Sequence, residues 1–342
     1  MYKIPYHTAD LGLHSFLITG GAGFIGSNLV EYLLKYQAGK VRVLDNLSTG
    51  QMENIRPFLS HPAFEFIEGD IRDLDTCKTA TAGMDYVLHQ AALGSVPRSI
   101  VDPITTHEVN ITGFLNMLMA VKDSSVKRMV YAASSSTYGD STALPKVEEK
   151  IGNPLSPYAV TKYVNELYAN VFASTYQMEL IGLRYFNVFG PRQDPKGAYA
   201  AVIPKFVDLL LKHQPPIING DGTHSRDFTF IENVVQANLL ALYVSDPEAI
   251  NTVYNVAYGE QTSLNLLVEM LKKYLSEKDY AIEGISAIHG PKRDGDIPHS
   301  LASIAKAKKN LGYSPHFNFT EGLKLAVQWY RDNSNVLPKG KN

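Results

Sequence analysis

Short apolar runs alternate with longer stretches of mixed polar and apolar residues through about residue 188. Each run has the length of a buried strand, and each mixed stretch has room for a helix. Strands that alternate with helices are typical of a parallel sheet covered by helices on both faces. The pattern therefore predicts an α/β fold with a Rossmann-type, doubly wound parallel sheet. The expected strands are residues 16–19, 41–44, 64–67, 86–89, 128–133 and 180–185.

The pattern changes after this point. Turns rich in Gly and Pro appear at residues 190–192 and 219–222, strands become fewer, and several helices are amphipathic. This indicates a smaller α/β lobe. Residues 231–256 combine a helix with a strand-like run and are expected to return to the sheet. We therefore expect a sheet domain of residues 1–188 plus about 231–258, and a smaller lobe of about 189–230 plus 259–342.

Composition excludes several classes of function. The 342 residues are 45% hydrophobic and 19% charged, with a net charge of −2, so there is no broad basic field for nucleic acid or an anionic membrane surface. No apolar run approaches the ~18 residues that span a bilayer, and the N-terminus lacks a signal-peptide layout, so we expect a cytoplasmic protein without membrane association. Cys77 is the only cysteine and is expected to be a buried, inert thiol. The ten histidines lack metal-site spacing, so no metal is expected.

A glycine-rich turn joins the first expected strand to a helix. Gly20 permits the tight turn, Gly23 lets the backbone approach a pyrophosphate, and Gly26 allows close packing of helix on strand. The second strand ends in Asp45, nineteen positions after Gly26, where an acid is expected to bind the adenosine ribose. This acid favours NAD over NADP. The expected dinucleotide contacts in these two segments are Gly20, Gly23, Phe24, Ile25, Gly26, Asp45 and Asn46.

Tyr158 and Lys162 are four residues apart and would share one helix face. Ser156 and Pro157 are typical of a helix cap and a first helical residue, which places Tyr158 at the positive end of the helix dipole. A cation beside the tyrosine would lower its pKa and allow it to act as a base. Alone, this spacing also fits a surface tyrosine beside a solvated lysine. The glycine-rich turn elsewhere in the chain favours the catalytic interpretation.

More candidate residues follow other expected strands, at the edge where open parallel sheets bind ligands. Asp70 and Ile71 are candidates for the adenine site, and the small residues beside Gln90 leave backbone accessible to a cofactor. A serine-rich turn follows residues 128–133, where a hydroxyl could bind the oxygen that Tyr158 deprotonates; plain loop solvation is the alternative. The candidates are Asp70, Ile71, Gln90, Ala91, Ala92, Ser134, Ser135 and Ser136.

Ordered motifs along nearly the whole chain resemble those of the extended short-chain dehydrogenases/reductases. Within that family the chain is most similar to the nucleotide-sugar 4-epimerases, especially bacterial enzymes that act on UDP-N-acetylglucosamine and UDP-N-acetylgalactosamine. The motifs are residues 19–26, 45–46, 69–73, 89–92, 134–139, 158–162, 184–190 and 293–296.

The resemblance implies bound NAD in the sheet domain, a UDP-sugar between the lobes, and a homodimer formed through a pair of helices, one of which carries Tyr158. Tyr158 would remove the proton of the sugar 4-hydroxyl while C4 gives hydride to NAD. Ser134 would bind the same oxygen, and Lys162 would hold the nicotinamide ribose. Return of hydride to the other face of the 4-keto sugar inverts C4. Ser135 and Ser136 remain possible substitutes for Ser134, and the matched motif adds Tyr185 to the cofactor site.

The same resemblance assigns substrate contacts. Asn187, Arg226 and Arg293 would bind the diphosphate, and Tyr199 would lie near the uracil. Ser300 stands where a bulky tyrosine narrows the pocket of hexose-restricted relatives, so it leaves space for a 2-acetamido group. Further hydrogen bonds to that group are expected from Ser135, Ser136 and Gln193. The expected reaction is interconversion of UDP-GlcNAc and UDP-GalNAc for surface polysaccharide synthesis.

Other readings stay open. The substrate could be UDP-glucose/UDP-galactose or a UDP-hexuronic acid, for which Arg98 could supply a cation. Ser135 and Ser136 replace the acid pair of a 4,6-dehydratase and disfavour that reaction. A non-catalytic NAD-binding sensor is the alternative outside enzymes. The N-terminal extension, residues 1–13, is expected either to pack across the fold or to be disordered.

Overall fold

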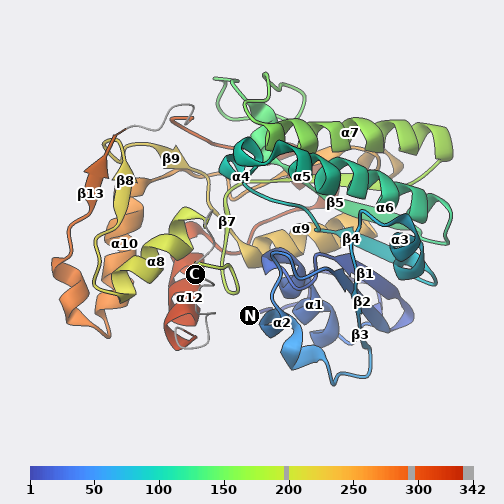
Figure 1. Cartoon of the computed structure of the whole chain (residues 1–342), viewed down its shortest axis with the longest axis horizontal. Coiled ribbons are helices and arrows are strands. Elements are labelled where there is room, and N and C mark those ends of the chain that lie inside the picture. Colours follow the sequence, from blue (N-terminus) through green and yellow to red (C-terminus); the bar gives the residue numbers. More distant parts are fainter. Residues whose placement is uncertain (196–199, 292–296, 334–342) are drawn as a thin grey trace.

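The centre of the molecule is a seven-stranded sheet in which every pair of neighbouring strands runs parallel (Figure 1). The computed structural model describes residues 1–195, 200–291 and 297–333. The predicted Rossmann-type fold is confirmed, and the strand expected within residues 231–256 joins one edge. In order across the sheet, the strands are β11 (Val253–Val256), β6 (Leu180–Tyr185), β5 (Arg128–Ser134), β4 (Tyr86–His89), β1 (Ser15–Thr19), β2 (Lys40–Asp45) and β3 (Phe64–Glu68).

Helices cover both faces of this sheet. The helices of this part are α1 (Phe24–Lys35), α2 (Met52–Ile55), α3 (Leu74–Thr81), α4 (Val96–Val101), α5 (Pro103–His107), α6 (Gly113–Lys122), α7 (Pro157–Tyr176), α9 (Ile231–Tyr243) and α11 (Ala305–Leu311). Among the described residues, no helix combines the length and apolar composition that crossing a bilayer requires.

The two faces are packed separately because strand side chains alternate in direction. In β1, Phe16 and Ile18 belong to one buried cluster with residues of α1 and α9. Leu17 points to the other face, into a second cluster with residues of α3, α6 and α7. Cys77 lies in that second cluster, and burial raises the pKa of its thiol to about 12, as expected for an inert cysteine.

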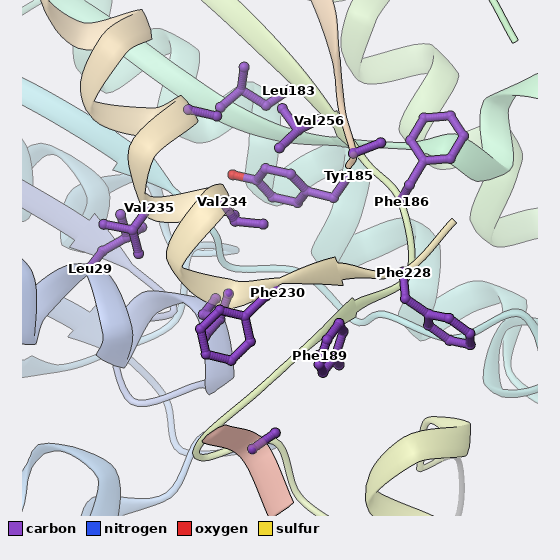
Figure 2. Close-up of a cluster of buried hydrophobic side chains, with 14 of the residues drawn as sticks. Leu29, Leu183, Tyr185, Phe186, Phe189, Phe228, Phe230, Val234, Val235 and Val256 are labelled. Atoms are coloured by element: carbon purple, nitrogen blue, oxygen red, sulfur yellow. The ribbon is translucent and has the colours of Figure 1, made fainter. Parts of the chain in front are cut away.

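The smaller part of the molecule shares its core with the sheet. Figure 2 shows Phe189, Phe228 and Phe230 gathered beside residues of α9. Phe319 of α12 stacks on Phe228 with ring centroids 5.3 Å apart. One continuous apolar cluster therefore joins the two parts. The elements here are β7 (Val188–Phe189), α8 (Val202–Leu211), β8 (Ile217–Asn219), β9 (Ser225–Arg226), β10 (Thr229–Phe230), β12 (Thr262–Ser263), α10 (Leu264–Ser276), β13 (Ile288–Gly290) and α12 (Phe319–Asp332).

A buried ion pair fixes α7 to the sheet. Arg184 of β6 donates from Nε and Nη2 to the two carboxylate oxygens of Glu166, at 2.9 and 2.7 Å. Both side chains are at most 5% exposed. The guanidinium also donates to the backbone oxygen of Glu148 and lies over the ring of Tyr138. Because Glu166 lies one turn after Lys162, the pair sets the height of α7 above the sheet.

Glu166→Gln is expected to lower the free energy of unfolding by about 3 kcal/mol, because it leaves the buried Arg184 charge without its partner. Urea denaturation measures this change. The matched control is Glu53→Gln, which removes an exposed pair with Arg56 and should cost under about 0.5 kcal/mol. A loss below about 1 kcal/mol for Glu166→Gln would show that the pair does not hold α7.

Candidate functional site

The glycine-rich turn joins β1 to α1 in the arrangement that its sequence predicts. Gly20 has a φ of +69°, which favours glycine, and a Cβ there would lie 2.8 Å from the backbone nitrogen of Ala91. A Cβ on Gly26 would lie 2.2 Å from the backbone oxygen of Gly20. Gly23 precedes α1 and caps it with no side chain. The N–H groups of the first turn of α1 are therefore accessible to a phosphate.

A cavity of about 500 Å³ opens in front of this turn. Its walls come from the turn itself, from the segments that follow β2, β3 and β4, and from residues 192–194. Twelve of the predicted cofactor contacts line it: Gly20, Gly23, Phe24, Ile25, Gly26, Asp45, Asn46, Asp70, Ile71, Gln90, Ala91 and Ala92. The structure thus brings four separate sequence motifs to one site.

Two acids at the ends of β2 and β3 face this cavity. The carboxylate of Asp45 accepts hydrogen bonds from the backbone nitrogens of Ala22 and Leu47, at 2.9 and 2.8 Å, and burial raises its pKa. Each carboxylate oxygen can accept a further bond, so a ribose hydroxyl fits there. Asp70 accepts from Asn46 and is paired with Arg72, whose hydrogen bonds hold the pKa of Asp70 at about 2. It is therefore ionised throughout the physiological pH range.

Tyr185 lies behind the cavity wall. Its hydroxyl donates to Oε1 of Gln90 at 3.1 Å and accepts from Nδ2 of Asn238 at 3.0 Å. Gln90 itself lines the cavity. Tyr185 thus orients a cavity residue, and its direct contact with the cofactor stays a prediction.

Residues distant from the glycine-rich turn close the cavity. Trp329 and Asn333, from α12 and its end, contribute to the wall, as do Arg192 and Asp194. None of the four was predicted, because no local pattern links residues 192–194 or α12 to the glycine-rich turn. The loop after Asp45 was also not predicted. Its polar and glycine residues follow the end of a strand, and this position could have indicated a place in the site. The residues of this loop that line the cavity are Ser48, Thr49, Gly50 and Gln51.

Ser134, Tyr158 and Lys162 form a second group of candidate side chains. Ser134 ends β5, and Tyr158 and Lys162 lie in the first two turns of α7, which Ser156 caps by accepting from the backbone nitrogen of Ala159. The Ser134 side chain lies near the Tyr158 hydroxyl and acts to lower its pKa. The Ser134 oxygen accepts bonds from both N–H and O–H of Ser136, at 3.1 and 2.9 Å, so its own proton is available for Tyr158.

The protonation of this group differs from the expectation based on sequence. Burial raises the pKa of Tyr158, and the neighbouring Ser134 side chain only partly opposes this effect. Lys162 donates to the backbone oxygen of Ala132 at 2.8 Å. Burial lowers the pKa of Lys162 to about 8, against the opposing charge of Glu166. In the protein alone, desolvation therefore outweighs the lowering of the tyrosine pKa that Lys162 was expected to cause.

The other predicted substrate contacts come from segments that follow β6 in the chain. Arg226 donates to the backbone oxygens of Ser225 and Pro298, at 2.9 and 3.2 Å, and the backbone nitrogen of Ser300 donates to Ser225 at 3.1 Å. Arg226, in β9, and the backbone of Ser300 therefore share the Ser225 oxygen as acceptor. Asn187 donates to the backbone oxygen of Asp227 at 3.0 Å. Tyr199 and Arg293 lie outside the described residues.

Gln193 was expected near the sugar, and the structure places it in the wall of the large cavity. Its amide nitrogen donates to the backbone oxygen of Val188 at 3.0 Å. Its Oε1 is buried and has no hydrogen-bond partner among the residues that the structure describes. A buried acceptor without a partner is costly to stability.

The cavity fits a dinucleotide. It offers a helix N-terminus for a pyrophosphate and carboxylates for ribose hydroxyls within one continuous space. Arg42, the nearby basic residue that could have bound a 2′-phosphate, points elsewhere and bonds Glu65 and backbone oxygens near the end of α3.

Comparisons with known proteins agree with this geometry. Residues 16–257 match the model of the NAD dependent epimerase/dehydratase family. A putative UDP-glucose 4-epimerase from Methanocaldococcus jannaschii is 38% identical over 94% of this chain and 99% of its own length.

Two solved structures are similar over almost the whole chain. A UDP-N-acetylglucosamine 4-epimerase from Methanobrevibacter ruminantium M1, in complex with UDP-N-acetylmuramic acid, is 38% identical with a TM-score of 0.86, covering 94% of this chain and 99% of its own. A Thermus thermophilus UDP-glucose 4-epimerase in complex with NAD is 34% identical with a TM-score of 0.81, covering 93% and 99%.

Gly26→Ala is expected to weaken NAD binding roughly tenfold or more, because the new methyl group would push α1 away from the Gly20 backbone. Trp329 is the only tryptophan and lines the cavity, so quenching of its fluorescence provides a binding assay. Gly284→Ala is the control, because a Cβ there meets no atom within 4 Å. Equal NAD affinity for both variants would contradict the role of the turn.

Proposed function

The chain belongs to the NAD dependent epimerase/dehydratase family, and on that premise we propose that it interconverts UDP-N-acetylglucosamine and UDP-N-acetylgalactosamine by inversion at C4. The observation that carries the proposal is the Ser134–Tyr158–Lys162 group on β5 and α7. The 38% identity to a UDP-N-acetylglucosamine 4-epimerase over nearly the whole chain supports it. We further propose that the reaction takes place in the cytoplasm and feeds polysaccharide synthesis.

In this proposal, Tyr158 moves the proton of the sugar 4-hydroxyl. It takes that proton when C4 is oxidised and returns it to the same oxygen when C4 is reduced. Ser134 donates a hydrogen bond to the oxygen while its charge changes. NAD, held by the residues around the glycine-rich turn, would supply the hydride acceptor and donor for C4 and a positive charge that favours the phenolate.

Lys162 supplies the positive charge of the Ser134–Tyr158–Lys162 group. Its pKa of about 8 means that the ammonium is present at neutral pH and is lost as the pH rises above that value. The ammonium lies one helical turn from Tyr158 and favours the ionised phenol. We propose that it also binds the nicotinamide ribose, with Gly20, Gly23, Asp45, Asp70 and Gln90 contacting the remainder of NAD.

Substrate choice is proposed to depend on Arg226 and Ser300. Arg226 is held by backbone oxygens of Ser225 and Pro298, so its charge is fixed in place beside Ser300. A guanidinium there suits one phosphate of UDP. The short Ser300 side chain leaves room for the 2-acetamido group. We assign supporting substrate contacts to Ser135, Ser136, Asn187, Tyr199 and Arg293.

UDP-glucose is the second candidate substrate. The M. jannaschii relative that is 38% identical is described as a putative UDP-glucose 4-epimerase. The two substrates differ only in the group at C2, so the space beside Ser300 distinguishes them.

Proton NMR of the purified protein incubated with UDP-N-acetylglucosamine tests the function. We expect the anomeric signal of UDP-N-acetylgalactosamine to appear. Tyr158→Phe should slow this conversion by roughly 10²- to 10⁴-fold, because no proton carrier remains. Tyr176→Phe, which alters an exposed tyrosine at the end of the same helix, should have no effect. Conversion at the wild-type rate by Tyr158→Phe would refute the assigned role.

Ser300→Tyr tests the choice of sugar. It should abolish conversion of UDP-N-acetylglucosamine by filling the space for the acetamido group, and it should spare UDP-glucose. The wild-type protein is compared on UDP-N-acetylglucosamine, UDP-glucose and UDP-glucuronate. Activity of the wild type on UDP-glucose or UDP-glucuronate alone would overturn the proposed substrate.

We propose that the protein forms a homodimer through α7 and its neighbour α5. Val160, Val164, Leu167 and Val171 follow a seven-residue repeat on α7, and three of them are 44–57% exposed. Ile104 of α5 is 72% exposed, and α5 packs beside α7 (Figure 1). Several exposed apolar side chains on two adjacent helices are typical of an interface.

Leu167→Glu should convert the dimer into a monomer, because a charge would be buried in the centre of the apolar surface. Light scattering during gel filtration measures the mass. Leu266→Glu, at a similarly exposed position on α10, should leave the dimer intact. A wild-type protein that elutes as a monomer would refute the proposal.

A further inference from the structure

The N-terminal segment, residues 1–13, is packed against the fold, which decides between the two expectations from its sequence. Tyr2 is fully buried and Tyr6 is 7% exposed. The Tyr6 ring stacks on Tyr32 of α1 with centroids 5.6 Å apart. Glu232 of α9 accepts from the Tyr2 backbone nitrogen and the Tyr6 hydroxyl, at 2.9 and 2.8 Å. The match to the family model begins only at residue 16, after this segment.

Tyr2 reaches α1 at a residue that also binds the cavity wall. Its hydroxyl donates to Oδ1 of Asn28 at 2.8 Å, and Nη2 of Arg192 donates to the same oxygen at 2.8 Å. Nδ2 of Asn28 donates to the backbone oxygens of Phe24 and Pro191, at 2.9 and 3.1 Å. All four hydrogen-bonding positions of this buried amide are thus filled, which fixes its orientation.

Two partners of Asn28, Pro191 and Arg192, belong to a segment beside the cavity. We call this segment, residues 190–195, the strap. Arg192, Gln193 and Asp194 line the cavity. The strap is attached at further points: Arg192 pairs with Glu31, Asp194 accepts from Gln51 at 3.1 Å, and Tyr330 donates to the backbone oxygen of Gln193 at 2.9 Å. Moving the strap would therefore break several bonds together.

Both ends of the connection have strained backbones. Tyr2 has a φ of +58° and Arg192 a φ of +70°, in the left-handed region that residues other than glycine rarely adopt. Such conformations persist only where surrounding contacts hold them. The bonds through Asn28 are contacts of this kind, and they join the two strained residues through one side chain.

We propose that Tyr2 is a positioning residue that, through Asn28, holds the strap against α1 and slows the release of NAD. An epimerase that oxidises and then reduces the same sugar needs its cofactor in place for both steps. The N-terminal segment helps to retain the cofactor although it lies outside the cavity. The inference rests on NAD as the ligand of the cavity and does not depend on which sugar is the substrate.

The test is the dissociation rate of radiolabelled NAD from the full-length holoprotein, chased with unlabelled NAD and no sugar. Tyr2→Phe keeps the ring and removes only the hydroxyl bonded to Asn28. We expect it to release NAD roughly 3- to 10-fold faster than wild type, the factor for one buried hydrogen bond. Tyr6→Phe is the matched control, because it removes a hydroxyl of the same segment that bonds Glu232 and not Asn28. Its rate should lie within twofold of wild type.

Two results would overturn the proposal. A Tyr2→Phe rate within twofold of wild type would show that the bond to Asn28 does not restrain NAD. Equal acceleration in Tyr2→Phe and Tyr6→Phe would show that general packing of the segment matters and the link through Asn28 does not. Because no sugar is present, either result leaves the proposed epimerisation to be judged separately.

Discussion

The parallel direction of all seven central strands is the constraint on which the rest of the structure depends. It brings the carboxyl ends of the strands to one edge of the sheet, so residues far apart in sequence meet there. Gly20 follows β1, Asp45 ends β2, Asp70 follows β3 and Gln90 follows β4, and all four line one cavity. Ser134 ends the next strand. The same rule that builds the cofactor cavity therefore positions the hydroxyl that meets Tyr158.

The elements outside the sheet turn this edge into an enclosed site. The Glu166–Arg184 pair fixes α7, and with it the two functional residues of its first turns, relative to β6. The strap and α12 cover the cavity from the smaller part of the molecule. Because one apolar cluster runs through both parts, the strap and α12 have a fixed position relative to the sheet. A protein that must hold one cofactor through oxidation and reduction benefits from such a rigid cover.

Local sequence patterns predicted the elements whose geometry is set by near neighbours. The glycine-rich turn, all six strands of the first half and the cap of α7 at Ser156 were recognisable because each depends on a few adjacent residues. Trp329 was missed because its place in the cavity depends on packing of α12 against segments more than a hundred residues away. The position of Gln193 in the wall of the same cavity also depends on packing between distant segments. The pKa of Tyr158 depends on burial, which residue spacing does not reveal.

The central claim is that C4 of a nucleotide sugar is oxidised and reduced by one cofactor that stays bound. The most direct measurement uses UDP-N-acetylglucosamine with deuterium at C4, incubated with the protein in ordinary water. The account predicts that the epimerised product carries the deuterium at C4 without loss, since the hydrogen that leaves as hydride returns to the same carbon. Exchange of that deuterium with solvent would contradict it, because the hydrogen would then have left C4 as a proton.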